Sequence, residues 1–125
     1  MALLHEELTD KILEAFFNVY NELGFGFLES VYENAMMKEL KDIGVECQSQ
    51  VPINVFYKEE KMGIFYADIL VEDLVILELK ATSLVEKFTY QLLNYLKATD
   101  IEVGMLLSFG KEAQFKRKLF MNTKK

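Results

Sequence analysis

Three charged residues interrupt an otherwise apolar stretch in the middle of the chain. Asp68, Glu78 and Lys80 stand within "YADILVEDLVILELKA", residues 66–81, whose Val, Ile, Leu and Ala content is typical of two neighbouring strands in a sheet core. A charged group in a buried strand must be paired, bound to a metal ion or used in catalysis. The stretch therefore predicts either a structural ion pair or a chemical site.

The spacing of these charges gives the site a geometry. If two antiparallel strands pair about a turn centred on Asp73, then Asp68 and Glu78 lie directly opposite each other, with Cβ atoms roughly 4.5–5.5 Å apart. Lys80 follows Glu78 by two residues and shares its face, where it would stand opposite Tyr66. A register shifted by one residue would put the two carboxylates on opposite faces.

Two facing carboxylates can bind one hard divalent cation, Mg²⁺ or Mn²⁺. Such a cation polarises a phosphoryl oxygen and lowers the pKa of bound water, while a neighbouring lysine can orient that water, deprotonate it or stabilise charge. This chemistry suits hydrolysis of a phosphodiester. The alternative is a structural ion pair in which Lys80 bridges one or both carboxylates. It explains less well why three charges gather on one face of an apolar hairpin.

Composition narrows the choice of chemistry. The chain has 125 residues, and we expect one domain over residues 1–125. A single cysteine and a single histidine argue against a disulfide, a zinc site or a histidine-based triad. No apolar run approaches the roughly 18 residues of a membrane span, and no signal peptide is recognisable, so we expect a cytoplasmic protein without a membrane partner.

The charge is unevenly distributed. The net charge of −6 is unlike that of a typical nucleic-acid-binding domain. Residues 111–125 nevertheless carry six Lys or Arg and one Glu, a net charge of +5, against −11 for residues 1–110. This basic segment could steer a polyanion locally, or it could simply be a solvated tail.

Apolar periodicity and turn residues predict the order of elements. Helical spacing covers residues 6–23, 28–43 and 84–98, the last opened by a capping box of Ser83 and Glu86. Strands are expected over residues 45–58, 62–71, 74–81 and 102–110, with a last short one in 114–120. Pro52 makes the first strand an edge or bent strand. The result is an α/β (α+β) fold of order ααβββαβ, a mixed central sheet flanked by helices.

These residues carry a resemblance to a known superfamily. Asp68 followed by Glu78-Leu79-Lys80 resembles the D…(D/E)xK signature of the PD-(D/E)xK nucleases, whose core has the order αβββαβ. The stretch from Gly26 through Glu29 to Tyr32 is similar to the motif that gives the GxxExxY proteins their name, and Gln91-x-x-x-Tyr95 follows at the expected place. The resemblance spans about residues 6–120. It departs at Ala67, where the superfamily name has Pro.

The resemblance implies roles for single residues. Asp68 and Glu78, with the Leu79 carbonyl as a third ligand, would bind Mg²⁺ or Mn²⁺, and Lys80 would be the catalytic lysine. Glu29, Gln91 and Tyr95 would complete the catalytic set, the last two sharing one face of their helix.

Each accessory residue has a simpler explanation as well. Glu29 could only stabilise a helix N-terminus, by roughly 0.3–1 kcal/mol. Gln91 could face solvent, and Tyr32 fits best as a packing residue. Gly26 fits a backbone conformation that side chains resist.

Two functions of different classes follow from these patterns. The first is a Mg²⁺-dependent phosphodiesterase, a nuclease acting on DNA or structured nucleic acid, and at this size we expect a homodimer. The second is a catalytically silent nucleic-acid-binding or assembly module that keeps the nuclease fold. A structural dimer is a third reading, because edge strands can pair subunits. Substrate, strandedness and pathway are not encoded in these patterns.

Overall fold

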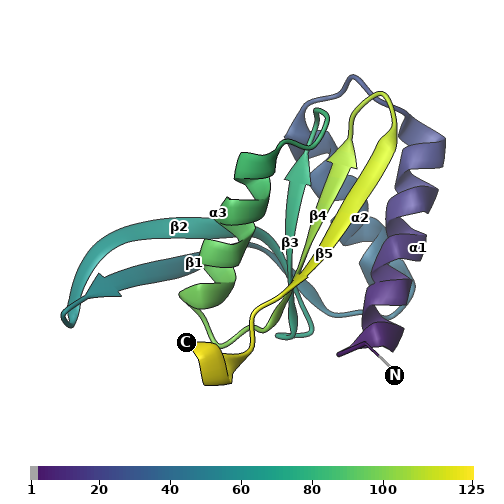
Figure 1. Cartoon of the computed structure of the whole chain (residues 1–125). Coiled ribbons are helices and arrows are strands. Elements are labelled where there is room, and N and C mark those ends of the chain that lie inside the picture. The colour runs from purple at the N-terminus through teal and green to yellow at the C-terminus, as the bar shows by residue number, and fades with distance from the viewer. Residues whose placement is uncertain (1–2) are drawn as a thin grey trace.

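A five-stranded mixed sheet lies between helices in the computed structural model, which describes residues 3–125 (Figure 1). The elements are, in chain order, α1 (Glu6–Leu23), α2 (Glu29–Asp42), β1 (Cys47–Tyr57), β2 (Glu60–Val71), β3 (Val75–Lys80), α3 (Glu86–Lys97), β4 (Val103–Phe109), β5 (Ala113–Leu119) and a short 3-10 helix (Asn122–Lys124). The strands stand in the order β1-β2-β3-β4-β5, and only β3 and β4 are parallel. The expected fold class is confirmed, and β5 completes the order as ααβββαββ.

Alternate residues of the central strands divide the core into two halves. One half packs against α1 and α2 and the other against α3. On β3 the odd-numbered residues Val75, Leu77 and Leu79 belong to the first half, whereas Ile76 belongs to the second. Because side chains alternate along a strand, Glu78 and Lys80 must lie on the α3 face with Ile76.

A glycine allows α3 to approach the sheet closely. A Cβ built on Gly104 of β4 would lie 2.6 Å from the Cδ1 atom of Leu92 on α3, which is far too close for real atoms. Leu92 is fully buried in the second half of the core. The missing side chain on β4 therefore fixes the height of α3 above the strands that carry the charged residues.

The β1–β2 hairpin bends sharply away from the rest of the sheet. On β2, Ile69 packs against α1 and α2, but Ala67, two residues earlier, packs on the α3 side. Residues two apart on a straight strand share one face, so β2 must twist at Asp68. On β1, Gln50 has a left-handed backbone with φ 52° at the matching point. The outer part of the hairpin, residues 52–66, sweeps away beside α3 (Figure 1) and is called the arm below.

The turn between β2 and β3 sets the register of the charged residues. Glu72 and Asp73 both have positive φ, and the N–H group of Leu74 donates to the Val71 carbonyl at 2.8 Å. The pairs run from Val71↔Val75 to Ile69↔Leu77, which is the register centred on Asp73 that the sequence predicts. Continuing it by one residue places Asp68 opposite Glu78.

The expected N-terminal cap of α3 was wrong. No side chain caps α3: the helix begins at Glu86 after an extended Val85, so the expected capping box with Ser83 does not form. The Glu86 carboxylate instead accepts a hydrogen bond from the Tyr90 hydroxyl at 2.7 Å, one turn along the exposed side of α3. None of the helices within residues 3–125 is long and apolar enough to cross a membrane.

Tyr32 closes the turn that leads into α2. Its hydroxyl donates to the Gly24 carbonyl at 2.7 Å and accepts from the Phe27 N–H at 3.2 Å. The Tyr32 ring is fully buried and stacks on Phe109 with centroids 4.2 Å apart. Between these contacts Gly26 has φ +109°, in the region that side chains disfavour. The packing role expected for Tyr32 is therefore joined by a hydrogen-bonding role.

We expect Tyr32→Phe to lower the free energy of unfolding by about 1–3 kcal/mol, because the Gly24 carbonyl loses its partner while the ring stacking stays. Urea unfolding measures this effect. Tyr57→Phe is the matched control, since Tyr57 is 62% exposed at the end of the arm and should leave stability unchanged. Equal stability of the two variants would contradict the stabilising role of the hydrogen bond from Tyr32 to Gly24.

Candidate active site

Two carboxylates fill the fork where β2 separates from β3. The N–H group of Asp68 donates to Oε2 of Glu78 at 2.8 Å, and the N–H group of Leu79 donates to Oδ2 of Asp68 at 2.8 Å. The strand pairing ends one residue earlier, at Ile69↔Leu77. Each carboxylate thus accepts from the backbone of the opposite strand at the point where the ladder stops.

Burial and mutual repulsion disfavour the charged forms of both groups. Glu78 is only 6% exposed, and burial together with the nearby Asp68 raises its pKa from 4.5 to about 8. Burial also raises the pKa of Asp68, although its hydrogen bond from Leu79 and the charge of Lys80 act in the opposite direction. The fork therefore holds two carboxyl groups that lack sufficient positive charge around them.

Lys80 lies beside the carboxylates without forming an ion pair with them. Its Nζ atom stands 4.5 Å from the centre of the Phe88 ring on α3. Among residues 3–125, only Lys38 and Asp42 form an ion pair within 4.0 Å. The expected position of Lys80 opposite Tyr66 was wrong, because β2 has left β3 at that point and Tyr66 pairs with Pro52. The Lys80 charge still favours the ionised forms of both carboxyls.

The donor set fits a hard divalent cation. Asp68 and Glu78 offer carboxylate oxygens, which Mg²⁺ and Mn²⁺ prefer, and a cation between them would relieve the repulsion that raises the pKa of Glu78. Within the described part of the chain, no three or more His, Cys, Asp and Glu side chains come together as a metal-binding group. A third protein ligand would have to be a backbone carbonyl such as that of Leu79.

Comparison with known proteins decides the family. Residues 6–118 match the family model described as the PD-(D/E)XK nuclease superfamily. The chain belongs to this superfamily. Comparison with curated proteins found no match, and comparison with solved structures found none either. The matched segment contains α1 through β5 almost entirely, including both carboxylates of the fork.

The accessory residues predicted from the sequence lie on α2 and α3. Glu29 is exposed in the first turn of α2, and its charge contributes to the raised pKa of Glu78, after burial and Asp68. Tyr95 is half-buried on α3, and burial followed by the charges of Glu78 and Asp68 raises its pKa. Gln91 is exposed one turn earlier and lines a cleft together with Tyr95. The charge effects place Glu29 and Tyr95 near the fork, and the shared cleft places Gln91 beside Tyr95. The roles of all three residues stay predictions.

Sequence reasoning missed two residues that contact this region. Gln50 donates from Nε2 to Glu33 Oε1 at 2.7 Å, and the same atom lies 3.5 Å from Oδ1 of Asp68. Burial, followed by the charges of Asp68 and Glu29, raises the pKa of Glu33 although the bond from Gln50 lowers it. Glu33 is four residues after Glu29 on α2, a helical spacing that could have flagged it. Gln50 carries no such signal, because its position depends on the bend in β1.

The raised pKa of Glu78 predicts how stability depends on pH without divalent metal. Between pH 4.5 and about 8 the folded protein holds a proton on Glu78 that the unfolded chain has released. The free energy of unfolding should therefore be highest at the acidic end and fall as pH rises, by up to about 1.4 kcal/mol per pH unit. Urea unfolding across this range in a chelating buffer measures it.

Glu78→Gln should reduce this slope strongly and leave the part due to the raised pKa values of Asp68 and Glu33. Glu112→Gln is the matched control, because Glu112 is exposed in the turn between β4 and β5, and it should keep the full slope. Stability that rises with pH in the wild type would contradict the buried, repelling pair.

Proposed function

We propose that this protein is a metal-dependent nuclease of the GxxExxY group, hydrolysing phosphodiester bonds in DNA or structured nucleic acid. One observation carries the proposal: two hydrogen-bonded carboxylates converge in a fork with a lysine alongside, without a close ion pair. Membership of the PD-(D/E)XK superfamily supports it. The turn closed by Gly26 and Tyr32, directly before Glu29, supports the finer assignment.

The roles follow from position in the fork. Asp68 and Glu78, with the Leu79 carbonyl, would hold Mg²⁺ or Mn²⁺. When bound, the ion supplies Lewis acidity and a more acidic water. The Lys80 ammonium rests over the Phe88 ring, which keeps a flexible side chain near the fork. From there the ammonium form would orient the attacking water or stabilise negative charge on the phosphate, and the neutral amine form would accept a proton from that water.

The residues on α2 and α3 would support this centre. Glu29 adds negative charge at the N-terminal end of α2, on the side of the fork opposite α3. Tyr95 and Gln91 present a hydroxyl and an amide from α3, suited to binding a phosphate or a water molecule. Their positions at one cleft support this assignment.

A second candidate is a catalytically silent binding or assembly module, and the arm favours it. Phe56, Tyr57, Met62 and Tyr66 are each at least half exposed there, and β1 is an edge strand that a second copy or another protein could cover. This candidate shares the fold with the nuclease but needs no charge in the fork.

Cleavage assays separate the two candidates. Wild-type protein should cut single-stranded DNA, duplex DNA or RNA with Mg²⁺ or Mn²⁺, and chelation should stop the reaction. Asp68→Asn, Glu78→Gln and Lys80→Met should each lower the rate by about 100-fold or more. Lys87→Met is the control for Lys80: it is an exposed lysine whose Nζ atom also lies near Phe88, at 5.7 Å, and it should retain the rate. Metal-independent cleavage, or none by the wild type, would reject the nuclease.

Thermal melting tests the metal site without relying on activity. Mg²⁺ or Mn²⁺ should raise the melting temperature of the wild type with the logarithm of its concentration, because only the folded state holds the ligands together. Asp68→Asn and Glu78→Gln should be at least as stable as the metal-free wild type but insensitive to the ion. If the carboxylates served only to balance the half-buried charge of Lys80, these variants would instead be less stable than the wild type.

A further inference from the structure

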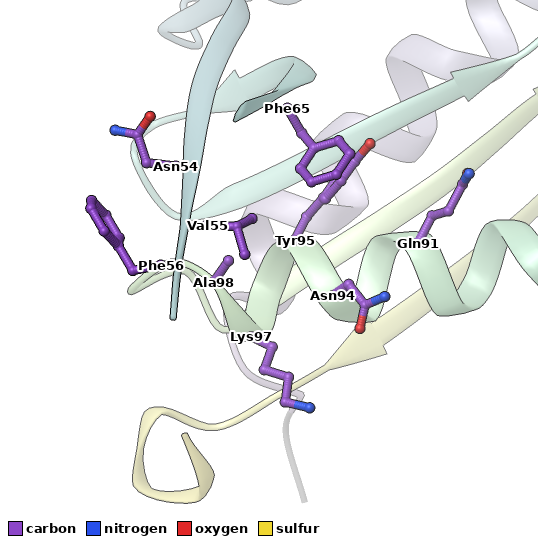
Figure 2. A pocket seen from close by; sticks show the side chains of 9 residues that line it. All are labelled: Asn54, Val55, Phe56, Phe65, Gln91, Asn94, Tyr95, Lys97 and Ala98. Carbon is purple, nitrogen blue, oxygen red and sulfur yellow. The ribbon is translucent and has the colours of Figure 1, made fainter. Parts of the chain in front are cut away.

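A cleft of about 560 Å³ lies between the arm and α3 (Figure 2). Its aromatic lining comes from Phe56 on β1, Phe65 on β2 and Tyr95 on α3. The rings of Phe65 and Tyr95 lie together at the middle of the view, with centroids 5.6 Å apart and planes tilted by 38°. Phe65 is nevertheless 48% exposed, so part of its ring surface is free for another flat group.

Four polar side chains also line the cleft. Asn54 from β1 and Asn94 and Gln91 from α3 each bring a carboxamide, and Lys97 brings a positive charge. A carboxamide offers both hydrogen-bond donors and an acceptor. Flat aromatic surface combined with paired donors and acceptors matches a nucleobase, whose faces stack and whose edges carry the same two kinds of group. Lys97 suits the adjoining phosphate.

We infer that this cleft binds an unpaired nucleobase, so that the substrate of the fork is single-stranded nucleic acid or an unpaired segment of it. The inference rests on the proposed nuclease function and names its substrate class. Tyr95 connects the two regions: it lines the cleft, and it packs against the core on the α3 side of the sheet, which includes Ala67, the neighbour of Asp68. A strand whose base stacks on Phe65 would therefore have its backbone close to the carboxylates.

The charge of the protein argues against a duplex as the substrate. Gripping a duplex relies on many Lys and Arg contacts to both phosphate backbones, yet the chain carries a net charge of −6. Stacking of bases on aromatic side chains supplies affinity that does not depend on neutralising phosphates. A paired base in a duplex has both of its faces occupied by neighbours and cannot enter the cleft.

Binding to a fluorescent purine analogue in a single-stranded oligodeoxynucleotide tests this inference. The Glu78→Gln protein serves as the background, so that no cleavage complicates the measurement. We expect quenching of the analogue on binding, tighter binding than to the matched duplex, and an affinity at least about fivefold lower in Phe65→Leu. Tyr57→Leu is the matched control, because Tyr57 is an exposed aromatic residue of the same arm outside the cleft.

A second variant tests the inference even if Phe65→Leu impairs folding. Asn94 is exposed on α3, so Asn94→Ala should melt normally while changing the relative affinity for the four bases. It should not change the affinity for a strand with an abasic site. Equal binding of duplex and single strand, with Phe65→Leu indistinguishable from Tyr57→Leu, would overturn the inference.

The nuclease proposal and the nucleobase-binding inference can be refuted separately. If wild-type protein cuts nucleic acid but Phe65→Leu has no effect on single-strand binding or KM, the inference fails and the nuclease proposal stands. If binding depends on Phe65 but no metal supports cleavage, the nucleobase site stands and the nuclease proposal fails. The same oligonucleotide in RNA form shows which sugar the cleft accepts.

Discussion

The structure depends on what happens where β2 leaves β3. Splitting two paired strands frees backbone N–H groups, and a buried N–H group without an acceptor is costly. Here the Asp68 and Glu78 carboxylates take the place of the missing strand carbonyls, accepting from Asp68 and Leu79 backbone groups at 2.8 Å each. The same residues that end the ladder thus form the candidate metal site, so fold and chemistry share one set of contacts.

The bend that opens this fork also creates the cleft. Gln50 adopts a left-handed backbone opposite Asp68, and beyond that point the strand residues change from the α1–α2 side to the α3 side. The arm therefore runs beside α3 and does not continue the flat sheet (Figure 1). Gly104 lets α3 sit low on β4, and from there Tyr95 packs beside Phe65 of the arm. The twist in β1 and β2 consequently places the fork, α3 and the arm together.

The sequence predicted the elements and the register well because both depend on local patterns. The α1 limits followed from apolar spacing and Gly24, and the pairing of β2 with β3 followed from a short turn centred on Asp73. What it missed depends on contacts between distant residues. The capping box at Ser83 failed because α3 begins later, after Val85. Because β2 bends away from β3, Lys80 does not lie opposite Tyr66. The same bend brings Gln50 between Glu33 and Asp68. The apolar periodicity of the sequence does not encode this bend.

The choice of glutamate at position 78 distinguishes a metal-binding site from a purely structural hydrogen bond. A structural role needs only an oxygen atom that accepts a hydrogen bond from the Asp68 N–H group, and the amide oxygen of a glutamine could accept it at almost the same place. A carboxylate adds the cost of burying charge and of facing Asp68, visible in a pKa raised to about 8. No lysine or arginine within residues 3–125 offsets it through an ion pair within 4.0 Å with Glu78. The negative charge therefore weakens the fold that contains it, and this cost is understandable if the charge serves to bind a cation.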